Sequence, residues 1–226
     1  MTGTHRPHNE VPPIEKTEQA TTALEQFAAA ILQVPKAAVR VAEEADRTTP
    51  RKKRPRLSPP AAAFLSTHTL FPDLPSARTA LLEVIERFSD PQDGHDLMVR
   101  LRWPDGVVCP RPGCGSADVA TIERRSKWRC RLCSRQFSVK VETLFEDSPI
   151  NFDKWLPTMW LLANTRTRIS SLELGRTLGV TQKTAWSMLH RLHLALETEQ
   201  FDRALSFDGE VPPETARAAA STWSYD

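Results

Sequence analysis

The chain has 226 residues, 40% of them hydrophobic, and a formal net charge of +2. Its 18 prolines against 8 glycines predict segments joined by stiff linkers rather than one compact body. The most apolar window, residues 155–163, is too short to span a bilayer, and no early stretch combines a basic start with an apolar run. These features exclude an integral membrane protein and a membrane partner, and we expect a soluble cytoplasmic protein.

The charge is segregated along the chain. Residues 100–140 carry ten Lys or Arg against three Asp or Glu, and this basic stretch contains all four cysteines. A local positive field attracts polyanions, and attraction to phosphates dominates affinity for nucleic acids. The distribution therefore indicates a nucleic-acid partner.

Residues 1–47 are expected to be a disordered or loosely helical region whose role the sequence does not indicate. Apolar residues recur at helical spacing between Ala23 and Leu32, and Pro35 divides this pattern into two short helices. Residues 48–75 follow as a linker, because a basic run and closely spaced prolines cannot build a core. The RKKRPR run in this linker either adds nonspecific phosphate contacts or is only a solvated segment.

Residues 76–102 form a predicted helical lead-in to the cysteine stretch. A first helix starts near Ser76 and ends at Asp90-Pro91, and a second runs from about Asp93 to Leu101. The first helix places its apolar residues on one face, at Ala80, Leu81, Val84, Ile85 and Phe88.

Residues 103–145 are predicted to be a zinc ribbon with the spacing C-x4-C-x15-C-x2-C. Short runs at 118–122, 127–130 and 136–141 are typical of small strands. Two short-spaced pairs supply the four soft ligands of a tetrahedral structural site, and four protein ligands leave no open position for a catalytic water. The pattern predicts one structural Zn²⁺ bound by Cys109, Cys114, Cys130 and Cys133. The alternatives are four buried free thiols, or a redox role for Cys130 and Cys133.

Six cations crowd the hairpin around the second cysteine pair, with Trp128 among them. They form either a solvated basic face over a small core that contains Trp128, or a surface that binds phosphates. The second interpretation is favoured, because six like charges over twelve positions repel one another unless a partner neutralises them. The predicted phosphate contacts are Arg124, Arg125, Lys127, Arg129, Arg131 and Arg135.

Residues 148–205 are predicted to be a three-helix, helix-turn-helix DNA-binding domain. The first helix, 151–164, supplies Trp155 and Trp160 to its core. In the pair that follows, Gly175 allows close approach, Gly179 makes the turn and Thr181 caps the second helix. The buried face of this second helix is predicted at Ala185, Met188, Leu189 and Leu192.

The second helix of this pair would present its outward side chains to the major groove. Gln suits adenine and Lys suits guanine, so the outward set is chemically suitable for reading bases. The predicted DNA contacts are Gln182, Lys183, Ser187 and His190, with Arg176 and Arg191 nearer the backbone. Trp186 also points outward, but an exposed indole is more often covered by a neighbouring domain, and we leave it out. The alternative is a plain helical hairpin.

Four stretches, RWPDGVVCPRPGCGS, WRCRLCSRQFSV, TLFEDSPINFDKWLPTMWLL and ISSLELGRTLGVTQKTAWSMLHRL, occur in this order. Together they resemble the N-terminal half of a family of bacterial insertion-sequence transposases, which carry a zinc ribbon, a helix-turn-helix and a DDE domain of the ISXO type. The resemblance covers about Ser76 to Leu205. It implies that the chain is nucleoid-associated and binds the terminal repeats of a transposon, with full-length transposase or a second copy as further partners.

Residues 206–226 depart from the family pattern and are predicted to be a divergent tail. Gly209, Glu210 and Val211 match the opening of the DDE domain, but Pro212 and Pro213 stand where a central strand should continue. We therefore expect a DNA-binding fragment that is truncated before the catalytic carboxylates and is inactive alone.

Two other functions remain open at this point. The chain could be a subunit of a transposase whose catalytic half is supplied by frameshifting. It could also be a zinc-stabilised adaptor that binds another protein through the Trp155 and Trp160 helix. All three interpretations share one fold class, mainly α with a small β zinc ribbon and a helix-turn-helix bundle.

Overall fold

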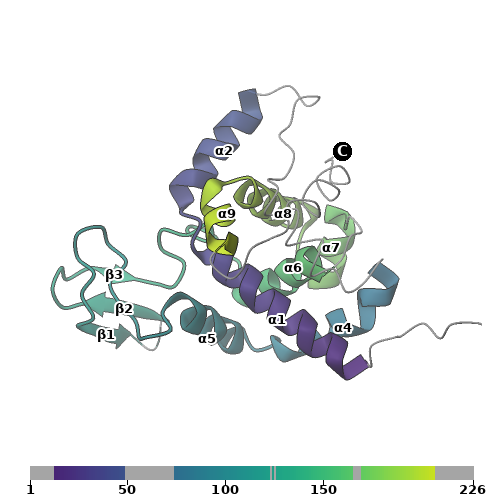
Figure 1. Cartoon of the computed structure of the whole chain (residues 1–226), viewed down its shortest axis with the longest axis horizontal. Coiled ribbons are helices and arrows are strands. Elements are labelled where there is room, and N and C mark those ends of the chain that lie inside the picture. The colour runs from purple at the N-terminus through teal and green to yellow at the C-terminus, as the bar shows by residue number, and fades with distance from the viewer. Residues whose placement is uncertain (1–12, 49–73, 123, 125, 165–168, 207–226) are drawn as a thin grey trace, which may run out of the picture.

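The computed structural model describes residues 13–48, 74–122, 124, 126–164 and 169–206. It confirms a mainly helical chain with one small sheet (Figure 1). Most of the predicted linker, and the predicted tail from residue 207 onward, lie outside these residues. The helices are α1 (Pro13–Leu32), α2 (Lys36–Thr48), α4 (Leu74–Arg87), α5 (Pro91–Arg102), α6 (Phe152–Asn164), α7 (Ser171–Leu178), α8 (Gln182–Leu196) and α9 (Glu199–Ser206). The strands are β1 (Val119–Ile122), β2 (Lys127–Cys130) and β3 (Gln136–Phe137).

Helix α6 is the centre of the helical body. Eleven of its thirteen residues are buried, including Trp155 and Trp160. A helix that is apolar on all sides must be covered on all sides. Here α1, α4, α5 and α8 all pack against it.

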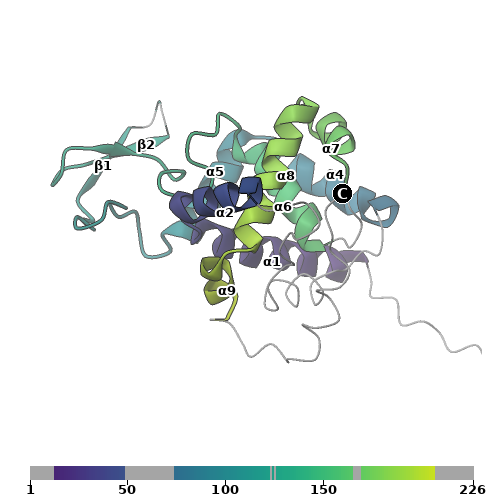
Figure 2. The same cartoon turned by 90° about the horizontal axis from the view of Figure 1, so that it is seen from above.

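The two helices predicted on either side of Pro35 are present as α1 and α2. The apolar stripe of α1 is buried, and α1 runs along one side of α6 (Figures 1 and 2). Helix α1 also packs on α9, where the ring of Phe27 meets that of Phe201 edge to face, with centroids 5.7 Å apart. Residues 21–47, for which the sequence indicated no role, therefore contribute to the main core.

Helices α7 and α8 are joined by the turn that the sequence predicted. Ser170 and Thr181 cap the two helices, accepting hydrogen bonds from the N–H groups of Glu173 and Thr184. Gly179 has φ +66° and ends α7 in a left-handed conformation. A Cβ on Gly175 would lie 3.0 Å from the carbonyl oxygen of Val180, so this position favours glycine because the backbone of the turn approaches it closely.

The sheet is antiparallel with the order β1-β2-β3, and Trp128 of β2 lies opposite Phe137 of β3. The third strand is shorter than the predicted run 136–141. After Phe137 the chain turns, Val139 enters the core, and the Lys140 ammonium donates to the carbonyl oxygens of Ser148 and Ile150. These contacts hold the chain in turns and so end the strand early.

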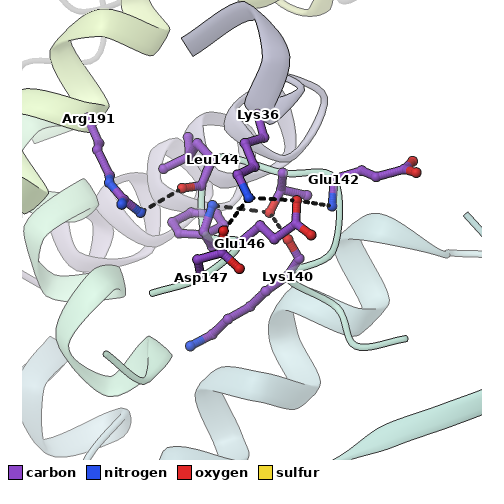
Figure 3. A network of polar contacts seen from close by, with 9 residues as sticks. Lys36, Lys140, Glu142, Leu144, Glu146, Asp147 and Arg191 are labelled. Atoms are coloured by element: carbon purple, nitrogen blue, oxygen red, sulfur yellow. Dashed lines mark hydrogen bonds and ion pairs between the residues drawn. The ribbon is translucent and has the colours of Figure 1, made fainter. Parts of the chain in front are cut away.

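The segment between β3 and α6 is attached to the helical body from two sides (Figure 3). From the start of α2, the Lys36 ammonium forms ion pairs with Asp147 and with Glu146, the latter at 3.4 Å. The Lys36 ammonium also donates a hydrogen bond to the Asp147 carboxylate, and this bond and the positive charge of Lys36 lower the pKa of Asp147. From α8, Arg191 donates to the carbonyl oxygen of Leu144 at 3.3 Å. The segment that follows the sheet is thus held by α2 and α8 together.

Figures 1 and 2 both place the sheet at one end of the molecule and helices α4 and α7 at the other. Among the described helices, none has the length and apolar composition needed to cross a membrane.

We predict that Phe27→Ala lowers the free energy of unfolding by about 3–5 kcal/mol, because the ring is fully buried and its removal leaves a cavity. Urea unfolding followed by circular dichroism measures this change. The matched control is Val41→Ala on α2, whose side chain is 71% exposed and whose change should stay within about 0.5 kcal/mol. Equal, small effects of the two substitutions would show that α1 is not part of the main core.

Candidate zinc centre and adjoining basic surfaces

The four cysteine sulfurs converge on one point. All four Sγ atoms lie within 4.8 Å of one another, and the Cys109–Cys133 and Cys114–Cys130 pairs are each 3.7 Å apart. Zn–S bonds of about 2.3 Å in a tetrahedron imply S···S edges of roughly 3.8 Å. The donor set therefore fits one zinc ion, and we identify a single structural zinc site, as predicted.

Two loops that differ in length close around this centre in the same way. In each, the N–H of the first cysteine donates to the carbonyl oxygen two residues beyond the second cysteine, Cys109 to Ser116 and Cys130 to Arg135, both at 2.9 Å. The residue directly after the second cysteine has a positive φ in both loops, 58° at Gly115 and 59° at Ser134. The C-x4-C and C-x2-C spacings thus produce equivalent backbone cradles.

The surroundings of the two buried thiols shift their pKa values in opposite directions. The backbone N–H of Cys133 points at the Cys130 sulfur and lowers the pKa of that thiol to about 7. Burial raises the pKa of Cys109 to about 12, so this thiol keeps its proton at neutral pH until a cation replaces it. Zinc binding must therefore displace protons, and its affinity falls as the pH falls.

An aromatic cluster joins the ribbon to α5. Trp128 on β2 stacks with Phe137 on β3 and meets Trp103, at the end of α5, edge to face with centroids 5.5 Å apart. His95 of α5 lies parallel to Trp128 at 5.8 Å. Trp128 therefore belongs to a small core, and α5 is structurally part of the ribbon.

The basic residues of the hairpin lie on the side away from this core. Along β2, Lys127 and Arg129 are exposed while Trp128 and Cys130 are buried, because alternate residues of a strand face opposite sides. The side chains of Arg124, Arg131 and Arg135 are exposed as well. Arg131 is 3.6 Å from the Asp118 carboxylate, and Arg125 lies outside the described residues.

On α8 the predicted DNA contacts differ in accessibility. Gln182 and Lys183 in the first turn are exposed, as is Arg176 on α7, whereas Ser187, His190 and Arg191 are half-buried. Arg191 also donates to the carbonyl oxygen of Leu144, and this contact holds the segment before α6 against α8. The predicted inner face, Ala185, Met188, Leu189 and Leu192, is buried throughout.

The structure removes the surface on which the adaptor interpretation depended. Trp155 is 1% exposed and Trp160 is fully buried, because α6 is enclosed by its neighbours on all sides. Both indoles are core residues, and another protein could not reach them in the folded chain. This agrees with the prediction that the helix at 151–164 supplies Trp155 and Trp160 to a core.

We predict that elemental analysis finds one equivalent of zinc per chain. The Cys130→Ser variant should lose this zinc, because it lacks one of the four ligands. Chelation should unfold the ribbon, because about 40 residues cannot hold a core of their own without the metal. A change in tryptophan fluorescence and in near-ultraviolet circular dichroism that is absent from a Trp128→Phe variant reports this unfolding. Leu132→Ser is the matched control, since Leu132 lies between the second pair of cysteines and is exposed. Zinc retained by Cys130→Ser, or lost from Leu132→Ser, would contradict the assignment.

Comparison with known proteins agrees with this architecture. Residues 90–136 match the family model described as a transposase zinc-ribbon domain, of the IS1595 type. The match begins at Asp90, the residue that caps α5, and so includes the helix that packs on Trp128. No solved structure matches the chain.

A curated relative covers part of the chain. This is an uncharacterized protein in transposable element ISH50 of Halobacterium salinarum, 26% identical over 116 residues, which are 50% of this chain and 38% of the relative. The chain thus spans less than half the length of this relative. The two similarities together support the predicted relationship of this chain to the insertion-sequence transposases.

Proposed function

We propose that the chain is a DNA-binding protein of an insertion element, in which the zinc ribbon and the α7–α8 pair bind the element's terminal repeats. The observation that carries the proposal is the outward presentation of two sets of suitable side chains. Lys127 and Arg129 stand on the exposed side of a metal-stabilised strand, and Gln182 and Lys183 stand at the exposed start of α8.

The ribbon supplies the contact with the phosphate backbone in this proposal. Lys127 and Arg129 lie on the side of β2 opposite Trp128, and Arg124, Arg131 and Arg135 are exposed next to the strands. Such cations bind any duplex, and each phosphate contact releases counterions, so the binding weakens as salt rises. This surface provides affinity and orientation rather than sequence recognition.

Helix α8 supplies the sequence recognition. We interpret α7 and α8 as a helix-turn-helix, with α8 in the major groove. Recognition helices contact bases mainly through their N-terminal residues. In α8 this half carries the exposed Gln182 and Lys183, while the other half is enclosed, with Leu194, Ala195 and Leu196 all buried. The end of the helix that must enter a groove is therefore the accessible end.

The two surfaces have separate places in the molecule, because the sheet and α7 lie at opposite ends (Figures 1 and 2). We therefore expect them to contact different parts of one DNA site. A second copy of the chain or a full-length transposase is a further proposed partner, because either protein would bind the same terminal repeats and so meet this chain on the DNA. Binding to these repeats would place the protein at the nucleoid.

We predict that Arg129→Ala and Lys183→Ala affect DNA binding in different ways. Arg129→Ala should weaken binding to all duplexes and reduce the slope of log affinity against log salt by about 1. Lys183→Ala should cost about 1–3 kcal/mol on terminal repeats and little on a shuffled duplex, because a base contact discriminates between sequences. Fluorescence anisotropy at several salt concentrations measures both.

The control variant for this experiment is Arg203→Ala on α9, which removes a cation whose side chain is 74% exposed and lies outside both proposed surfaces. It should bind like the unchanged chain. Equal affinity of the unchanged chain for repeats and shuffled DNA would refute sequence recognition. A loss in Arg203→Ala as large as that in Arg129→Ala would refute the assignment of the ribbon surface.

A further inference from the structure

Trp186 lies in the middle of the exposed stripe of α8 and has no place in the DNA contacts predicted from the sequence. It follows Lys183 by three residues and Gln182 by four, and His190 follows it by four. Residues at these spacings share one face of a helix. The side chains proposed to read bases therefore surround Trp186 rather than lie apart from it.

The exposure of Trp186 distinguishes it from the other tryptophans that the structure describes. Its side chain is 48% exposed, while Trp103, Trp128, Trp155 and Trp160 are buried. Among the described residues, it is the sole aromatic side chain in the set of exposed large hydrophobics, which otherwise contains Val41, Leu82, Leu132 and Leu172. An indole left in water at this position is available for a ligand.

The indole is also held in one orientation. Its ring stacks on the imidazole of His190, with centroids 4.8 Å apart and planes at 14°. Stacking of this kind limits the rotamers of the indole before any ligand arrives, so less conformational entropy is lost on binding. The pair is a preformed apolar surface one turn beyond Gln182 and Lys183.

The major groove offers one apolar group to such a surface. Adenine, guanine and cytosine present hydrogen-bonding groups there, whereas thymine presents its C5 methyl group. Lys183 and Gln182 suit the polar edges, and Trp186 suits the methyl group. Resting on the proposed function, we propose that Trp186, positioned by His190, contacts a thymine methyl group and so determines a preference for thymine in the recognised sequence.

The experiment replaces single thymines by deoxyuridine, which removes only the methyl group. Duplexes are first selected by the full chain from a random-sequence pool, and each thymine of a selected duplex is then replaced in turn. Burial of one methyl group corresponds to about a fourfold change in affinity. We expect such a loss at one or two thymines with the unchanged chain, and no further loss at these thymines with Trp186→Ala. Trp186→Phe should keep the dependence.

The control is Val41→Ala, an exposed apolar residue on α2, which should keep the full dependence on the methyl group. Absence of any methyl dependence in the unchanged chain, or equal dependence in Trp186→Ala, would overturn the inference while leaving the proposed function intact. A shift from dimer to monomer in Trp186→Ala without DNA would also overturn it, because a second copy would then cover the indole. Failure to enrich any sequence would refute the proposed function itself.

Discussion

The burial of α6 dictates how the other helices are arranged. A thirteen-residue helix with eleven buried residues cannot lie on a surface, and its neighbours must enclose it. Helices α1, α4, α5 and α8 do so, although they come from segments far apart in the sequence. The N-terminal region is therefore a structural requirement of the domain, since without α1 one side of α6 would meet water.

The same constraint positions both proposed DNA-binding surfaces. Helix α5 packs on α6 and also ends at Trp103, which contacts Trp128 in the ribbon. Helix α8 packs on α6 through its inner face, which turns Gln182 and Lys183 outward. Lys36 and Arg191 then attach the segment between the ribbon and α6 to the helical body (Figure 3). The ribbon is therefore connected to the helices both before its first cysteine and after its last strand.

Zinc and hydrophobic burial divide the stabilisation of this chain between them. The ribbon has three short strands and a small aromatic cluster, which is too little apolar burial to hold four thiols together without a metal. The helical body, by contrast, is held together by the burial of apolar side chains from all of its helices that pack on α6.

Sequence patterns among near neighbours in the chain predicted the four zinc ligands, the helix cap Thr181 and the turn residue Gly179. Only the folded arrangement shows that α1 covers α6, that Arg191 donates to Leu144 and that Trp186 stays exposed. The reason is physical: capping and metal ligation have fixed spacing and direction, whereas hydrophobic burial has no direction and does not specify which distant segment provides the cover.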